Sequence, residues 1–96
     1  MEEIKDELVK FQKERDWKKF HTPENLAKSI SIEAAELLEH FQWGYDYDID
    51  EVADELADVF NYCFLMAIEL DLDVKEIILN KMKKNAVKYP PKKDIC

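Results

Sequence analysis

Two pairs of acidic residues stand at helical spacing in the middle of the chain. Glu33 and Glu36 are separated by two alanines, and Glu55 and Asp58 follow at the same spacing. If both pairs lie on helices, each pair presents two carboxylates on one flank of its helix, because residues three apart are neighbours on a helix surface. Carboxylate oxygens at this density are the donors that Mg²⁺ or Mn²⁺ prefers. The pattern predicts a divalent metal site formed by these four residues.

The alternative is a pair of solvated helix faces, which also carry acids at this spacing. No lysine or arginine lies between Lys28 and Lys75, while thirteen acids occupy that stretch. Because an ordinary surface helix mixes charges of both signs, this run leaves its carboxylates without cationic partners along the chain. A divalent cation would neutralise them. The net charge of −8 also argues against a duplex nucleic-acid binder, which needs a basic face.

Four helices must position these residues. Apolar periodicity predicts a first helix over residues 2–15, and Thr22 with Pro23 marks the start of a second helix that runs to about residue 41. A third helix is expected from residue 48 or 50 to about residue 70, and a fourth from Asp73 to just before the KYPPK stretch. No segment alternates with the period of two that a strand requires. The sequence therefore predicts one all-α domain over residues 1–96.

The third helix is expected to be buried on more than one side. Residues 59–68 are apolar around nearly the whole helix, and the inward stripe is predicted to be Val52, Leu56, Val59, Cys63 and Leu70. A chain of 96 residues has a thin core, so contact with other subunits is the natural way to cover such a helix. The sequence has no signal peptide and no apolar run of about 18 residues, which predicts a cytoplasmic protein without a membrane partner.

Three stretches of the chain resemble the MazG-like nucleotide pyrophosphohydrolases, an all-α family that includes the short dCTP pyrophosphatases. These stretches are RDWKKFHTPENLAKSISIEAAELLEHFQW, DELADVFNYCFLMA and KMKKNAVKYP, and the resemblance covers about residues 8–91. The EXXE and EXXD pairs of the family are matched by the two acidic pairs, with 18 residues between Glu36 and Glu55. The FHTP and FQW blocks resemble the dCTP branch.

The resemblance implies hydrolysis of a nucleoside triphosphate between its α and β phosphates, giving a monophosphate and pyrophosphate. It implies that Mg²⁺, with Mn²⁺ as a substitute, is held by the four acids, one of which serves as general base. It also implies a base pocket around Trp17, His21 and Trp43, to which Phe20 is added, with Tyr62 near the sugar or phosphate. The candidate triphosphate clamp is in the lysine-rich end of the chain and consists of Lys81, Lys84, Asn85 and Lys88.

The expected substrate is dCTP or a modified dCTP, and the expected role is removal of unwanted nucleotides from the pool. The expected architecture is a four-helix subunit, a MazG-like bundle assembled as a homo-oligomer, and the short chain with its apolar third helix favours a tetramer over a dimer. Two alternatives stay open. One is a non-catalytic acidic module that uses residues 59–68 to bind partner helices, and the other is a relative that binds nucleotides without cleaving them.

Overall fold

The computed structural model describes residues 2–44 and 46–92, and these residues contain helices and turns but no strand. The helices are α1 (Glu2–Glu14), α2 (Pro23–Glu39), α3 (Ile49–Glu69) and α4 (Val74–Lys88), with a short 3₁₀ turn, η1 (Lys18–Phe20), between the first two. The predicted all-α class and the four helices are confirmed, and each helix boundary lies within two residues of its predicted position.

Side-chain caps explain where three of the helices begin. Thr22 accepts a hydrogen bond from the backbone N–H of Asn25 and Pro23 follows it at the first helical position, as predicted. Asp48 caps α3 through the N–H groups of Asp50 and Glu51. Asp73 caps α4 through the N–H of Glu76. Each cap satisfies backbone donors that have no partner inside the helix, so the starts of α2, α3 and α4 are encoded locally.

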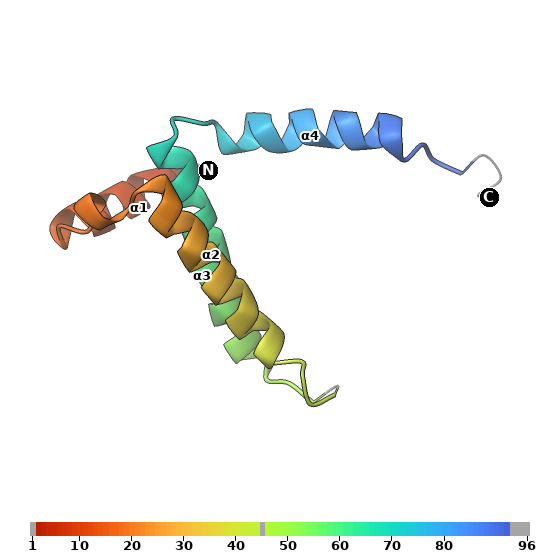
Figure 1. The fold of residues 1–96 in the computed structure, drawn as a ribbon, viewed down its shortest axis with the longest axis horizontal. Helices are drawn as coiled ribbons and strands as arrows, with labels where there is room; N and C mark the ends of the chain where they lie inside the picture. The colour runs from red at the N-terminus through yellow and green to blue at the C-terminus, as the bar shows by residue number, and fades with distance from the viewer. Residues whose placement is uncertain (1, 45, 93–96) are drawn as a thin grey trace.

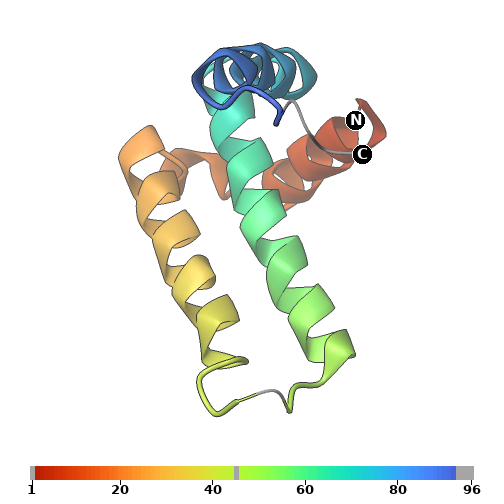
Figure 2. The ribbon, with the colours of Figure 1, turned by 90° about the vertical axis from the view of Figure 1, so that its right-hand side faces the viewer.

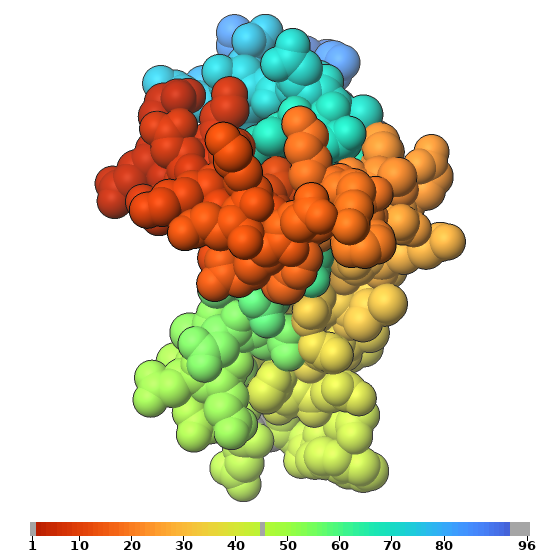
Figure 3. All heavy atoms as spheres, turned by 90° about the vertical axis from the view of Figure 1, so that its left-hand side faces the viewer, coloured from red at the N-terminus to blue at the C-terminus, as the bar shows by residue number. Residues whose placement is uncertain are grey.

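The centre of the structure is the antiparallel pair of α2 and α3, which lie side by side along their lengths (Figures 1 and 2). Helix α1 crosses α3, and with η1 it covers one end of this pair (Figure 3). The apolar side chains buried in the described residues are Leu26 of α2 and Leu65 and Ala67 of α3. This small core lies at the covered end of the pair, while the other end carries the connection between α2 and α3.

Helix α4 does not complete a four-helix bundle within one chain. It leaves the end of α3 and extends away from the other helices (Figure 1). Its apolar side chains are therefore exposed, among them Ile78, Met82 and Val87. The radius of gyration is 16.7 Å, whereas a compact domain of this length has about 12 to 13 Å. The chain by itself leaves much apolar surface in contact with water.

The predicted inward stripe of α3 is wrong in part. Leu56, Cys63 and Leu70 are exposed, whereas the half-buried positions recur at residues 52, 55, 59, 62 and 66. The face of α3 that meets α2 thus includes Glu55, which the apolar pattern had assigned to a flank. The apolar pattern could not distinguish the faces because α3 is apolar on several sides and one chain covers only some of them.

None of the helices in the described part of the chain combines the length and apolarity that a membrane crossing needs.

Candidate metal centre and adjoining cavity

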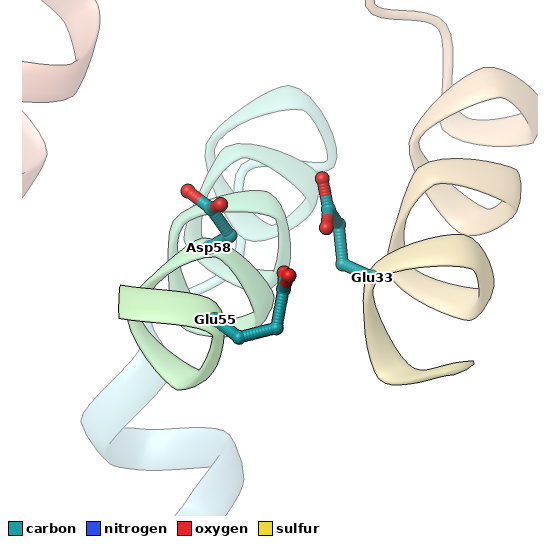
Figure 4. Close-up of side chains that lie close together, drawn as sticks. All are labelled: Glu33, Glu55 and Asp58. Carbon is teal, nitrogen blue, oxygen red and sulfur yellow. The ribbon is translucent and has the colours of Figure 1, made fainter. Parts of the chain in front are cut away.

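Three carboxylates converge between α2 and α3. Glu33 projects from α2 toward α3, where Glu55 and Asp58 stand one turn apart (Figure 4). One carboxylate oxygen from each residue lies within 4.8 Å of the others. Two oxygens bound to one divalent cation at about 2.0 to 2.6 Å from it are separated by distances within this range. The arrangement therefore has the size and the donor type of a site for Mg²⁺ or a similar cation.

Two of these carboxylates have an oxygen that is shielded from water, although the side chains of Glu33 and Glu55 are only half-buried and Asp58 is exposed. One oxygen of Glu33 and one of Glu55 are buried and have no hydrogen-bond partner among the described residues. A buried polar atom without a partner costs about 1 to 3 kcal/mol, and more when it is charged. No lysine or arginine pairs with these groups within residues 2–44 and 46–92. A cation would supply the missing partner for both oxygens, so the residues present fit a divalent metal.

The proximity of the acids has a large effect on Glu33. The carboxyl groups of Glu36 and then of Glu55 can accept a hydrogen bond from a protonated Glu33, which raises the pKa of Glu33 from 4.5 to about 8, and burial and the charges of the same neighbours add to the shift. Without a cation, Glu33 therefore holds its proton at neutral pH. A bound cation favours the ionised form and would release that proton.

Glu36 is adjacent to this cluster but is not one of its three converging members. It lies one turn after Glu33 on α2 and is half-buried. Residues three apart are neighbours on a helix surface, so Glu36 lies on the same side of α2 as Glu33, whose pKa it raises.

A cavity of about 530 Å³ opens directly beside the carboxylates. Its walls come from α1, from the segment that follows α1, and from α2 and α3. The lining includes Glu33 and Asp58 at one side and Trp17, His21 and Tyr62 around them. Pockets that hold small molecules are commonly about 300 to 1,000 Å³, so this volume admits a nucleotide-sized ligand.

Aromatic rings form a continuous series along this cavity. Phe11 packs edge to face with Trp17 at 5.4 Å between ring centroids, Trp17 lies 6.2 Å from His21, and His21 lies 6.4 Å from Tyr62. Such rings offer π faces that stack with any nucleobase. The series ends at Tyr62, one turn after Asp58 on α3, so aromatic and carboxylate walls meet there.

The hydroxyl of Tyr62 is held in its protonated form. Burial raises the pKa of Tyr62 above its usual value of 10, and the negative charges of Glu33, Asp58 and Glu36 raise it further. A phenol that keeps its proton can donate a hydrogen bond to an anionic ligand. Tyr62 is thus a hydrogen-bond donor beside the acidic cluster.

The structure brings some of the predicted site residues together and leaves others apart. Trp17, His21 and Tyr62 line the cavity beside Glu33 and Asp58. Phe20 is 59% exposed and Trp43, near the connection between α2 and α3, is 87% exposed, and neither lines the cavity. The predicted clamp residues also lie outside it, because they are carried by α4, which extends away from the site: Lys81, Lys84, Asn85 and Lys88.

Helix α1 contributes a wall that the sequence analysis did not anticipate. Leu8, Phe11 and Gln12 line the cavity from α1. Gln12 is 6% exposed and its Oε1 lies 2.8 Å from Nδ1 of His21. The signal in the sequence was a glutamine four residues after Leu8, a polar residue on the side of the helix that is otherwise apolar.

Comparison with known proteins agrees with this geometry. Residues 28–95 match the model of the MazG-like family. The chain is 33% identical to dCTP pyrophosphatase 1 of Mus musculus and, equally, of Homo sapiens, over 94% of this chain and 59% of each relative. It thus spans little more than half the length of these relatives.

Among solved structures, a pyrophosphatase from Archaeoglobus fulgidus is similar over nearly its whole length. It shares 44% identity with this chain, and the match covers 95% of this chain and 93% of that one with a TM-score of 0.86. The family match includes both acidic pairs and all of α3 and α4. By its sequence and by its fold, this chain belongs to the MazG-like family.

Proposed function

We propose that the protein is a nucleoside triphosphate pyrophosphohydrolase that depends on a divalent cation, with Mg²⁺ as the first candidate and Mn²⁺ as a substitute. It would cleave a nucleoside triphosphate between the α and β phosphates to give a monophosphate and pyrophosphate. The observation that carries this proposal is the pair of buried, unpartnered oxygens of Glu33 and Glu55, which stand with Asp58 beside an aromatic cavity. A metal-bound triphosphate needs both of these features.

The residues of the chain have distinct roles in this reaction. Glu33, Glu55 and Asp58 would hold the cation, with Glu36 as a fourth ligand or as general base. When bound, the cation neutralises charge on the phosphates and lowers the pKa of a coordinated water. Trp17 offers a face for the base, and the protonated hydroxyl of Tyr62 donates to the sugar or to a phosphate oxygen.

The best candidate substrate is dCTP or a modified dCTP. The support is the 33% identity to dCTP pyrophosphatase 1 of two mammals, together with the resemblance of the FHTP and FQW blocks to the dCTP branch. The proposed role is removal of unwanted or modified nucleotides from the cytoplasmic pool. The proposed domain spans residues 1–96.

We infer that the working protein is a homo-oligomer, with a tetramer favoured over a dimer. Support comes from the exposed apolar side chains of α4 and of the outer side of α3, such as Phe60 and Met82, which a second copy would cover. The position of the predicted triphosphate clamp also supports an oligomer. Helix α4 extends away from the cavity of its own chain, so its predicted clamp residues would serve the site of a neighbouring copy: Lys81, Lys84, Asn85 and Lys88.

The test is release of pyrophosphate from a panel of nucleoside and deoxynucleoside triphosphates in the presence of Mg²⁺. Glu33→Gln and Asp58→Asn should each lower kcat/KM at least about a hundredfold and weaken metal binding, because each removes a charged donor from the cluster. The matched control is Glu39→Gln, which alters an exposed acid of the same helix and should leave both quantities unchanged.

Two results would change the proposal. If no triphosphate is hydrolysed and the two substitutions leave metal and nucleotide binding intact, the enzyme is ruled out and the acidic interaction module stands. If nothing is hydrolysed but both substitutions abolish metal binding, the protein binds nucleotides without cleaving them.

A further inference from the structure

Among the described residues, Gln12 is the one polar residue that is buried. Its side chain lies against the candidate base pocket. It lies on α1, is 6% exposed, and lines the cavity with Trp17 and His21. Burying an amide is costly unless its hydrogen bonds are satisfied. The partner of Gln12 is His21, whose Nδ1 lies 2.8 Å from Oε1 of the glutamine. The pair therefore accounts for the burial and also constrains the imidazole.

The orientation of the Gln12 amide assigns a tautomer to His21. The amide oxygen of Gln12 faces Nδ1 of the ring, and because an amide oxygen can only accept, this orientation assigns the proton to Nδ1. In the neutral ring the other nitrogen, Nε2, is then an acceptor. Within residues 2–44 and 46–92, no group forms a hydrogen bond with Nε2. The ring of His21 thus offers one free acceptor at a wall of the cavity.

Neighbouring rings hold the imidazole in place. Trp17 and Tyr62 contact His21 edge to face, at centroid distances of 6.2 Å and 6.4 Å. The backbone N–H of His21 donates to the carbonyl of Lys18, and Thr22, the next residue, caps α2. The two aromatic contacts and the contact with Gln12 restrict rotation of the ring. The acceptor is therefore preorganised.

We propose that Gln12 determines base selectivity by positioning His21 so that Nε2 accepts a hydrogen bond from the exocyclic amino group of the base. This inference depends on the proposed function, because it names the class of base for that site. The 4-amino group of cytosine and the 4-oxo group of uracil stand at the same place on the ring, so an acceptor at the wall distinguishes the two bases by hydrogen bonding and not by size. An oxo group at the same place is a hydrogen-bond acceptor, as Nε2 of His21 is. Two acceptors cannot bond to each other, so both would be left unsatisfied. The site therefore selects cytosine over uracil.

Gln12→Met tests this assignment, because methionine has a similar length and keeps the apolar contacts but cannot accept from Nδ1. Affinities are measured by calorimetry for the α,β-imido analogues of dCTP and dUTP, which bind without being cleaved. The wild type should prefer the cytosine analogue at least about tenfold, and Gln12→Met should reduce that ratio to about one or two. Because both ligands are compared on one variant, a general loss of stability does not alter the ratio.

The control variant is Lys10→Met, which changes an exposed residue of α1 that does not line the cavity and should leave the ratio unchanged. A second readout does not depend on the variant or on any ligand. Nitrogen-15 NMR of the wild-type imidazoles distinguishes a ring protonated at Nδ1 from one protonated at Nε2, and His40→Asn identifies which signals belong to His21. The expected result is a His21 ring protonated at Nδ1.

The outcomes separate this inference from the proposed function. Loss of the ratio in Gln12→Met together with the Nδ1 tautomer supports it, whether or not any triphosphate is hydrolysed. A His21 ring protonated at Nε2 overturns it, and so does an unchanged ratio in Gln12→Met. If neither analogue binds at all, the inference and the nucleotide site are both overturned. If both analogues bind but no triphosphate is cleaved, only the proposed hydrolysis is lost.

Discussion

At the scale of single residues, the site combines acids that repel one another with one acid that keeps its proton. Glu33 has close carboxyl neighbours from its own helix and from α3, and its pKa rises to about 8. Such a cluster is unfavourable in the apo protein and favourable once a cation is present. A solvated acidic surface lacks this combination, because each of its carboxylates keeps its own water.

Metal-free protein should lose stability as the pH rises. The folded state binds the proton of Glu33 more tightly than the unfolded chain does, since its pKa is about 8 when folded and near 4.5 when unfolded. The stabilising contribution is therefore complete below pH 4.5 and is lost as the pH rises through 8. Thermal unfolding in a chelator at pH 5 to 8.5, compared with Glu33→Gln, measures it.

Glu33→Gln mimics the protonated acid at every pH, so its stability should exceed that of the wild type at pH 8.5. Saturating Mg²⁺ should stabilise the wild type most at high pH, because binding then requires less proton release. Equal pH profiles for wild type and Glu33→Gln in chelator would show that Glu33 ionises normally in the folded state.

At the scale of elements, the caps connect local sequence to the site. Thr22 begins α2 directly after His21, so one cap sets both the helix start and the position of a cavity residue. The positions of the acids of α2 and of the His21 ring are therefore fixed relative to one another. The short segment that contains Thr22 and Pro23 therefore positions both His21 before α2 and Glu33 on α2, which line the cavity from different sides.

Thr22→Ala should lower the free energy of unfolding by about 1 kcal/mol, because it removes the acceptor for the N–H of Asn25. The loss should also loosen His21 and weaken binding of a nucleotide analogue. Thr22→Ser keeps the hydroxyl and serves as the control. Denaturant unfolding of both variants measures the change, and equal midpoints for Thr22→Ala and Thr22→Ser would mean that the cap contributes nothing.

Much of the fold could be predicted from the sequence, because the relevant signals are local. Capping residues and apolar periodicity predicted where the helices lie, and the isolated acidic pairs pointed to the centre between α2 and α3. Two features could not be predicted. The apolar surface of α3 surrounds the helix, so periodicity did not reveal that Cys63 is exposed and that Glu55 faces α2. The burial of Gln12 depends on how α1 crosses α3, which is a tertiary contact.

At the scale of the whole molecule, the extension of α4 is the dominant feature. One chain has dimensions of 54 × 36 × 25 Å and a core of few side chains, and its lysine-bearing helix points away from its acidic site. A chain of this length needs apolar burial that this shape does not supply. The same extension that leaves α4 uncovered allows it to reach a neighbouring copy.

Mixing two inactive variants tests whether α4 acts on a neighbouring copy. One variant lacks the metal site through Glu33→Gln, and the other lacks the clamp cations through Lys81→Ala, Lys84→Ala and Lys88→Ala combined. The two variants are unfolded and refolded together so that their chains mix. If each site takes its clamp from a partner within a pair of chains, about half of the pairs are mixed and one of the two sites in each mixed pair is intact. About a quarter of the wild-type activity should then return. Activity is measured as pyrophosphate release.

If each chain uses its own clamp, no restored site can arise in the mixture. The control is a mixture of Glu33→Gln with Asp58→Asn, which damages the same cluster in both chains and should stay inactive. Light scattering of each variant confirms that the assembly state is equal in all samples.

The placement of the two tryptophans gives the molecule a built-in optical reporter. Trp17 lines the cavity, whereas Trp43 is 87% exposed near the connection between α2 and α3, and the chain contains no other tryptophan. Trp43→Phe leaves a single indole whose fluorescence responds to whatever stacks against it. Occupancy of the cavity can then be titrated in unlabelled protein, and rapid mixing can resolve ligand arrival from the chemical step.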